Sequence, residues 1–182
     1  MENYREAFLI EQIYATIFSS ANKLQVQGDK YFDKITSRQL MAMVAIAHLQ
    51  EDETTLNNIA RKLGNTKQST KQLITIIENK GYIETVPSKM DKRAVNVKIT
   101  ELGKQVVLEC GEKSINFFAD LSKGFTTEEM EILWLLLKKL YRFDGEAQDG
   151  FEEEAYLETG EDRMERLERN LKEFGKRRHE KR

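Results

Sequence analysis

The segment that most constrains the fold of this chain runs from residue 56 to residue 99, where two short helical patterns precede two strand patterns. In the first helix, apolar residues recur at helical spacing, at Leu56, Ile59, Ala60 and Leu63. Gly64 is placed to end that helix, and Thr66 is suited to cap a second one. Two strand-prone runs follow, marked by Tyr82, Ile83, Val86, Val95, Val97 and Ile99. The segment therefore predicts a helix-turn-helix followed by a β-hairpin.

The same segment is strongly basic within a chain that is nearly neutral. From Thr54 to Thr100 there are nine Lys or Arg residues and three Asp or Glu residues, a net charge of +6, whereas the whole chain has a net charge of −2. Phosphate neutralisation is local and releases counterions where it occurs, so such a segment is suited to bind a polyanion.

The second helix of this segment has two kinds of surface. Its apolar residues, which we expect to be buried, are Leu73, Ile74, Ile76 and Ile77. Its first two turns carry polar residues, namely Lys67, Gln68, Ser69, Lys71 and Gln72. Side chains of these types read bases and phosphates in the major groove of DNA, although a merely solvated helix face is the alternative for this helix taken alone.

The predicted hairpin has a long basic tip, from Pro87 to Ala94, that packing does not explain. Its charged residues are Lys89, Asp91, Lys92 and Arg93. Such a tip is suited to a wing that lies along the DNA backbone and inserts one cation into the minor groove.

The run from Met90 to Gly103 (MDKRAVNVKITELG), preceded by a helix that ends at residues 78–83 (ENKGYI), resembles the wing signature of the MarR family of bacterial transcriptional regulators. The resemblance covers roughly Tyr4 to Phe143. It implies a homodimer whose recognition helices enter successive major grooves of a pseudo-palindromic double-stranded DNA. It also implies that Asp91 orients the wing and that Arg93 is the minor-groove arginine.

The resemblance further implies a small aromatic or phenolic inducer, bound where the dimer helices meet the DNA-binding lobe. The residues that we expect to line such a pocket are Tyr14, Phe18, Met43 and Phe117, and each is equally suited to the core.

Four further helices are predicted around the helix-turn-helix. They run from Tyr4 to Gly28, from Thr36 to about Leu49, from Thr100 to about Ser122 and from Thr126 to about Arg142. Thr36 with Gln39, and Thr126 with Glu129, have the spacing of capping boxes. The first and last of these helices have unusually wide apolar faces. A single-chain core would absorb this surface, but in a dimer the two helices would interlock, as the resemblance also implies.

The predicted protein is mainly α with a small β-hairpin wing. Residues 1–34 and 100–143 form a helical dimerisation region, and residues 35–99 form the winged helix-turn-helix domain. Residues 144–162 hold nine acids and no base, so they are predicted to be an acidic linker. The part beyond Phe143 lies outside the resemblance.

Residues 163–182 hold nine bases and four acids. An amphipathic helix is predicted from Glu161 to about Phe174. Its i, i+4 acid–base pairs are Asp162–Arg166, Glu165–Arg169, Glu168–Lys172 and Glu173–Arg177. We expect it to pack on the dimer, or on a second dimer, through Met164, Leu167, Leu171 and Phe174. Residues 176–178 would then be free to contact phosphate. A solvated, frayed helix is the alternative.

Other chemistries lack the residues they need. With only His48, His179 and Cys110 available besides carboxylates, we expect no metal and no cofactor. No glycine-rich phosphate loop or local catalytic constellation indicates an enzyme. Cys110 lies on an apolar-rich helix, where a buried small residue is more typical than a redox switch. Relatives that sense peroxides typically carry their cysteine on the first helix, which here has none.

No run approaches the roughly 18 apolar residues that a membrane span needs, and the first residues lack the pattern of a signal peptide, so we expect a cytoplasmic protein. The sequence therefore predicts a homodimeric, sequence-specific DNA-binding transcriptional regulator, more a repressor than an activator. The alternative is a winged-helix module whose basic face meets an acidic partner, or the chain's own linker, instead of an operator.

Overall fold

The structure is a computed structural model of the 182-residue chain, and it describes residues 2–88, 95–145, 151–152 and 163–180. The described part is mainly helical with one antiparallel hairpin, which confirms the predicted fold class. In chain order the elements are α1 (Glu2–Gly28), η1 (Asp29–Tyr31), α2 (Ser37–Ala47), η2 (Glu51–Glu53), α3 (Leu56–Lys62), α4 (Lys67–Asn79), β1 (Ile83–Pro87), β2 (Val95–Ile99), α5 (Glu101–Ser122), α6 (Thr127–Tyr141) and α7 (Arg163–His179).

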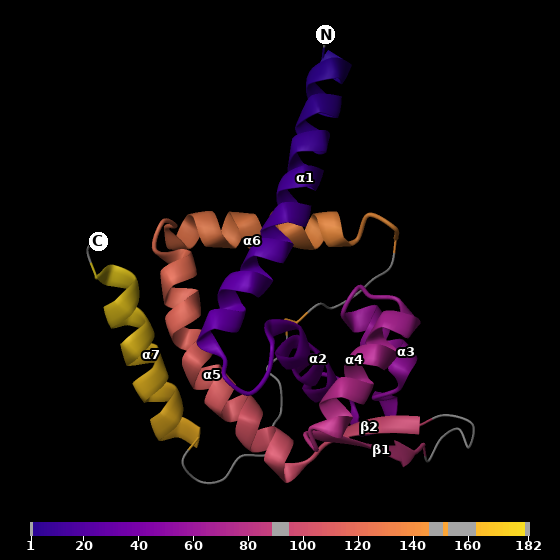
Figure 1. Cartoon of the computed structure of the whole chain (residues 1–182). Helices are drawn as coiled ribbons and strands as arrows, with labels where there is room; N and C mark the ends of the chain where they lie inside the picture. Colours follow the sequence, from indigo (N-terminus) through magenta and orange to yellow (C-terminus); the bar gives the residue numbers. More distant parts are fainter. Residues whose placement is uncertain (1, 89–94, 146–150, 153–162, 181–182) are drawn as a thin grey trace.

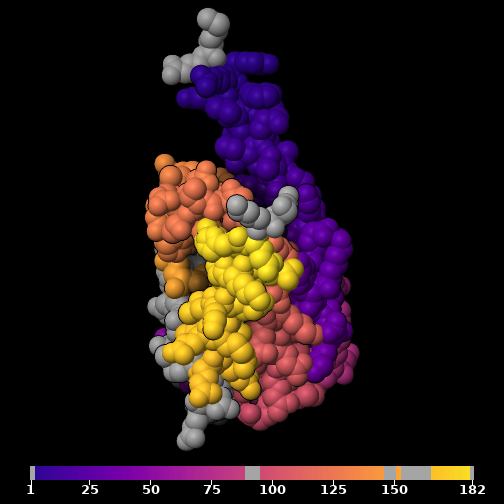
Figure 2. Space-filling view, turned by 90° about the vertical axis from the view of Figure 1, so that its left-hand side faces the viewer, coloured from indigo at the N-terminus to yellow at the C-terminus, as the bar shows by residue number. Residues whose placement is uncertain are grey.

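The elements form a compact lobe with long helices leading away from it (Figure 1). Helices α2, α3 and α4 and the hairpin make up the lobe, and α5 runs from the hairpin to α6. Helix α1 extends far beyond the rest of the molecule, and α6 crosses it in this view. Helix α7 lies along the outer side of α5, where it covers part of that helix (Figure 2).

The hydrophobic core lies inside the lobe and extends into the first half of α5. Its largest side chains with less than 2% exposure include Met43, Ile59, Ile77 and Val106. Val106, Val107 and Cys110 of α5 belong to the same buried cluster as the residues of α2 to α4. The first turns of α5 are therefore packed as part of the winged-helix lobe.

Threonine caps start four of the helices where the sequence predicts them. Thr36 and Thr126 form capping boxes with Gln39 and Glu129, so both predicted boxes are confirmed. Thr66 caps α4, and Thr100 caps α5 by accepting a hydrogen bond from the Gly103 N–H.

The hairpin is joined tightly to α5. Strands β1 and β2 pair with Ile83 opposite Ile99 and with Pro87 opposite Val95. The Thr100 N–H donates to the Tyr82 carbonyl at 3.0 Å. A Cβ atom added to Gly103 would lie 1.9 Å from that carbonyl oxygen, so glycine is required for this approach.

Two helices carry much apolar surface that the chain itself leaves uncovered. On α1, Phe8, Ile10 and Ile13 are 51%, 52% and 45% exposed. On α6, the run of residues 133–137 (LWLLL) is exposed along its whole length. Among the described residues, no helix combines the length and apolar character that crossing a bilayer requires.

Candidate nucleic-acid interface

Local signals set the geometry of the helix-turn-helix. Thr55 Oγ1 accepts a hydrogen bond from the Asn58 N–H at 3.3 Å, and Thr66 Oγ1 accepts one from the Ser69 N–H at 3.2 Å. Gly64, between the two helices, has φ = 61°, a left-handed conformation that favours glycine. The caps and this turn together fix the direction in which α4 leaves α3.

Helix α4 buries one face and exposes the other. Thr70, Ile74 and Ile77, which lie at i, i+4 and i+7, are 0%, 5% and 0% exposed. The predicted major-groove residues lie on the first two turns, where Lys67, Gln68, Lys71 and Gln72 are exposed and Ser69 is half-buried. The structure therefore brings this set together on an outward face, supported from behind by a buried face.

The predicted burial of Ile76 is wrong, because its side chain is 47% exposed. Residues in an α-helix are about 100° apart around the axis, so Ile76 lies about 200° from Ile74. The buried polar residue Thr70 takes the inward position that the apolar pattern of the sequence did not reveal.

Among the basic residues of the segment that the structure describes, Lys80 and Lys98 are held by polar contacts with other parts of the chain. Lys80 Nζ donates to Gln39 Oε1 and to the Lys34 carbonyl, each at 2.9 Å, and so joins α4 to the start of α2. Lys98 on β2 pairs with Glu51, and this contact raises the pKa of Lys98 through the hydrogen bond to that carboxylate. The positive charge that this segment offers to a ligand is therefore smaller than the net charge of +6 counted from its sequence.

The wing strands are held against the end of α4. Glu78 Oε1 accepts hydrogen bonds from the Thr85 N–H at 3.1 Å and from the Thr85 hydroxyl at 2.9 Å. The end of β1 next to α4 is thus fixed relative to that helix. The predicted wing-tip residues Lys89, Asp91, Lys92 and Arg93 lie outside the described residues.

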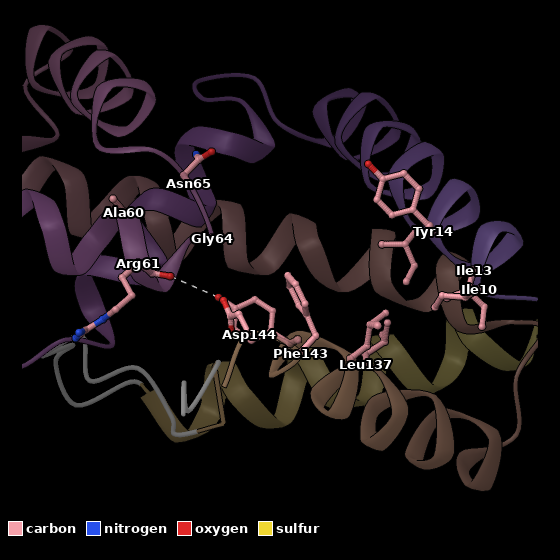
Figure 3. Close-up of a pocket in the computed structure, with 13 residues that line it drawn as sticks. Ile10, Ile13, Tyr14, Ala60, Arg61, Gly64, Asn65, Leu137, Phe143 and Asp144 are labelled. Carbon is pink, nitrogen blue, oxygen red and sulfur yellow. Dashed lines mark hydrogen bonds between the residues drawn. The ribbon is translucent and has the colours of Figure 1, made fainter. Parts of the chain in front are cut away.

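A cavity of about 860 Å³ lies between α1, the α3–α4 turn and the end of α6 (Figure 3). Ile10, Ile13 and Tyr14 from α1 face Leu137 and Phe143 across it. The remaining lining residues are Ile17, Ala60, Arg61, Gly64, Asn65, Leu140, Tyr141 and Asp144. At one end, the Tyr141 hydroxyl donates to the Arg61 carbonyl at 3.4 Å and so links α6 to α3.

Of the four residues predicted to line a ligand pocket, Tyr14 alone lines this cavity. Met43 is fully buried in the lobe core, and Phe117 packs against Tyr31 with ring centroids 5.4 Å apart. Phe18 is 65% exposed and stacks on Tyr14. The structure therefore does not bring these four residues together.

Sequence reasoning missed the α6 and α3 walls of the cavity. Leu137, Leu140 and Tyr141 recur at helical spacing, but this spacing by itself predicts only a dimer surface. Arg61 stands out in the sequence only as part of the basic segment. A cavity between segments far apart in the chain leaves no local pattern that would identify it.

Helix α7 is held on α5 mainly through Asp120. The Arg177 guanidinium donates to Asp120 Oδ2 at 2.6 Å, the Tyr31 hydroxyl donates to the same oxygen at 2.9 Å, and Lys123 lies 3.0 Å from Oδ1. The hydrogen bond from Arg177 holds the pKa of Asp120 well below its ordinary range. This cluster links η1, α5 and α7.

The structure corrects several expectations for α7. The helix extends to His179 rather than to Phe174, and Leu167 and Leu171 are 46% and 58% exposed. Arg177 pairs with Asp120 of α5 rather than with Glu173 of its own helix. Its predicted freedom to contact phosphate is therefore wrong.

Two further arginines of α7 also make polar contacts with residues outside that helix. Arg169 pairs with Glu112 of α5 at 3.1 Å, and Arg178 donates to the Phe125 carbonyl at 2.9 Å. Arg178 is therefore also not free for phosphate. Polar contacts thus supply much of the docking, while Phe174 of the predicted apolar stripe is half-buried and Leu167 and Leu171 are exposed.

The single cysteine is buried in the core. Cys110 is 3% exposed, and burial raises the pKa of its thiol, which disfavours the reactive thiolate. Within the described ranges, no three His, Cys, Asp or Glu side chains converge as metal ligands would.

No protein-family model matches the sequence. The chain is 37% identical over 62 residues to the multiple antibiotic resistance protein MarR of Salmonella typhimurium, which covers 34% of this chain and 43% of that relative. It is 24% identical over 152 residues to the transcriptional repressor MprA of Escherichia coli K12, which covers 81% of this chain and 83% of the relative. The first alignment thus spans less than half of the Salmonella protein.

Solved structures show the same fold over most of the chain. A MarR/EmrR family regulator from Acinetobacter sp. ADP1 superposes with a TM-score of 0.66 at 23% identity, covering 75% of this chain and 97% of that one. A cysteine-to-serine mutant of Escherichia coli MarR in complex with operator DNA has a TM-score of 0.63 at 24% identity, covering 72% and 94%. The organohalide-sensing regulator RdhR, in its 2,4-dichlorophenol-bound form, has a TM-score of 0.64 at 18% identity, covering 74% and 80%.

A helix-turn-helix followed by a two-stranded wing, with long helices on either side, defines a winged helix-turn-helix protein. The chain has the winged-helix fold of the MarR family of transcriptional regulators, and the resemblance seen in its sequence is confirmed. The Acinetobacter protein is named as a transcriptional regulator and the Escherichia coli relative as a transcriptional repressor.

Proposed function

We propose that this protein is a sequence-specific DNA-binding transcriptional regulator that acts in the cytoplasm as a homodimeric repressor on a pseudo-palindromic operator. The observation that carries the proposal is the outward face of α4. Its first two turns expose lysine and glutamine side chains, while Ile74 and Ile77 anchor the opposite face in the core. A helix fixed in this way presents a defined set of donors and acceptors to a major groove.

Each part of this surface has its own task in the proposed complex. Gln68 and Gln72 would read base edges, and Lys67, Ser69 and Lys71 would contact bases or phosphates. In the wing, Arg93 would enter the minor groove, Asp91 would orient the tip, and Lys89 and Lys92 would contact the backbone. The wing assignments rest on the motif in the sequence.

A homodimer would cover the apolar surface that the single chain exposes. Helix α6 carries Leu135 and Leu136 at 58% exposure each, and α1 carries Ile10 at 52%. Contiguous apolar surface of this extent marks a protein interface. A two-fold axis near α1 and α6 would place two α4 helices on one side of the dimer, as half-sites about one DNA turn apart require.

The alternative, a module that binds an acidic protein or its own linker through the basic face, has less support. Within the described part of the linker, Glu152 contacts Lys138 and Arg142 on and beside α6, not the exposed residues of α4. The described linker residues therefore give no contact with the exposed face of α4 that would support this alternative.

The cavity beside α1 supports regulation by a small aromatic compound. It is walled mainly by apolar residues such as Ile13, Leu137 and Phe143, with the polar groups of Asn65 and Tyr141 at its edge. That composition suits a phenolic ligand. Because the cavity contacts both the α3–α4 turn and α6, a bound ligand would shift the helix-turn-helix relative to the dimer helices and change the spacing of the recognition helices.

Selection from a random duplex library, followed by anisotropy titrations, tests the proposed function. We expect enrichment of a pseudo-palindrome. We expect Gln72→Ala to cost roughly 1–3 kcal/mol on that site and little on random duplex. Asn79→Ala, the loss of an exposed amide at the far end of the same helix, is the matched control and should leave affinity unchanged. Failure to enrich any duplex above the starting library would overturn the proposal.

A further inference from the structure

A second hollowed surface lies between α3 and the C-terminal end of α6, apart from the exposed face of α4. We call this surface the α3–α6 groove. Phe151 and Glu152, which follow α6 along the chain, lie against it and form one side of a remaining hollow of about 280 Å³. The other residues that line it are Lys62, Leu63, Trp134, Leu137, Lys138, Tyr141 and Arg142.

Phe151 contacts the helix-turn-helix side of the groove. Its ring meets the His48 imidazole edge-on, with centroids 5.4 Å apart and planes at 88°. Lys62 Nζ lies 5.4 Å from the centroid of the Phe151 ring, within the range of a cation–π interaction. His48 is the C-cap of α2 and Lys62 is the last residue of α3, so this aromatic ring contacts the lobe.

Glu152 contacts the α6 side of the groove. Its Oε1 lies 2.8 Å from Lys138 Nζ and 3.7 Å from the Arg142 guanidinium. Glu152 and Lys138 are 31% and 27% exposed, so solvent screens this pair less than a fully exposed one. Lys138 also lies 4.5 Å above the Trp134 ring, which positions its ammonium group.

Two adjacent residues of the linker therefore reach two different parts of the molecule. The aromatic ring binds beside a cation and an imidazole on the lobe, and the carboxylate binds beside two cations on α6. The groove thus has complementary chemistry for an aromatic side chain followed directly by an acid. Within residues 144–162, the acids that follow Phe151 directly are Glu152, Glu153 and Glu154.

We propose that the α3–α6 groove is a binding site for an aromatic–acidic chain segment and that Phe151–Glu152 of the same chain binds there through the contacts with His48, Lys62, Lys138 and Arg142. Occupancy joins the helix-turn-helix lobe to α6 through a part of the chain that lies outside both. This restrains rotation of the lobe about the end of α6. The site does not depend on DNA binding, so it stands or fails independently of the proposed function.

Trp134 provides a direct test, because it lines the groove and is the single tryptophan of the chain. Acrylamide quenching of its fluorescence in the full-length protein measures how well the groove is covered. We expect Phe151→Ala and Glu152→Arg each to raise the quenching constant. Glu173→Arg, the same charge reversal at an exposed site on α7, is the matched control and should not change it.

Charge exchange separates a specific contact from a general loss of structure. We expect Arg142→Glu alone to raise the quenching constant, and the double variant Arg142→Glu with Glu152→Arg to return it toward the wild-type value. Quenching in the double variant equal to the sum of the two single effects would overturn the pairing. Far-UV circular dichroism establishes that each variant is folded.

Hydrogen exchange tests the connection to the lobe. In Phe151→Ala we expect faster exchange for the amides of Leu56–Lys62, next to the lost ring, while the amides of β1 and β2 exchange as in the wild type. Unchanged exchange in α3 would overturn the claim that occupancy restrains the lobe.

Discussion

Thr70 lies on the buried face of α4 at 0% exposure, and within the described part of the chain its hydroxyl has no hydrogen-bond partner. Burying an unpaired hydroxyl costs free energy, so we expect Thr70→Val to raise the free energy of unfolding by about 1 kcal/mol. Urea denaturation measures this change. Thr75→Val is the matched control, since the Thr75 hydroxyl is exposed and donates to the Lys71 carbonyl at 3.0 Å. A destabilised Thr70→Val would show that the hydroxyl has a partner in solution.

Because Asp120 stays ionised, we expect its contribution to the docking of α7 to stay constant between neutral and mildly acidic pH. Its pKa is lowered from an ordinary 3.8, chiefly by the hydrogen bond from Arg177. A carboxylate with a lowered pKa contributes its full stabilisation above the unfolded pKa and loses it as the pH falls toward the folded value. We expect Asp120→Asn to lower the melting temperature from pH 8 down to pH about 5, with the difference from wild type closing below pH about 4. A difference that closes near pH 6 would assign the effect to another group.

At the scale of single residues, the sequence predicted local partners well and distant ones poorly. Thr66 and Thr126 cap their helices because the cap and its partner lie within four residues. Spacing along the helix assigns Arg177 to Glu173, but Arg177 pairs with Asp120, which is 57 residues away. Spacing along a helix identifies the carboxylate that is nearest in the sequence. It does not identify a carboxylate from another helix that the fold brings to the arginine.

The junction between the wing and α5 depends on one glycine. A Cβ at Gly103 would lie 1.9 Å from the Tyr82 carbonyl oxygen and 2.9 Å from the Ile99 side chain. Backbone cannot yield as a flexible side chain can, so we expect Gly103→Ala to cost about 3 kcal/mol or more in unfolding free energy. Chemical denaturation checks this, and a near-neutral effect would mean that the hairpin and α5 are not held this closely.

Gly111 on the same helix provides the matched control with the opposite expected sign. A Cβ added there would meet nothing within 4 Å. Because glycine weakens a helix interior, we expect Gly111→Ala to stabilise the protein by roughly 0.5–1 kcal/mol. Changes of opposite sign in the unfolding free energy at these two glycines would distinguish the effect of steric overlap from the effect of helix propensity.

At the scale of elements, helix starts and strand positions were predictable and the cavity was not. Capping boxes, Gly64 and the alternation of β1 and β2 are signals within a few residues. The cavity between Tyr14 and Leu137 joins segments more than a hundred residues apart, so no window of sequence contains both walls. Helix α7 continues past its predicted end because contacts of Arg177 and Arg178 with α5 and its C-terminal loop support the last turns.

For the whole molecule, the uncovered face of α6 is where the proposed dimer is most easily tested. Leu136 is 58% exposed in the single chain, and a charge there would be buried in a dimer. We expect Leu136→Glu to raise the dimer dissociation constant about 100-fold, corresponding to roughly 3 kcal/mol. Sedimentation velocity measures this. Ile76→Glu, at 47% exposure on α4, should leave the sedimentation coefficient unchanged. Equal sedimentation of both variants and the wild type would exclude α6 from the interface.

The part of α1 that extends beyond the body of the single chain would make the proposed repressor sensitive to gene dosage. If two copies must meet to cover that helix, the species that binds DNA forms in proportion to the square of the free subunit concentration below the dissociation constant. Doubling the copy number of the gene would then about quadruple the active form at low abundance. Occupancy of the operator would then rise more steeply than the concentration of the protein. The target promoter would change from unoccupied to occupied over a narrow range of protein concentration.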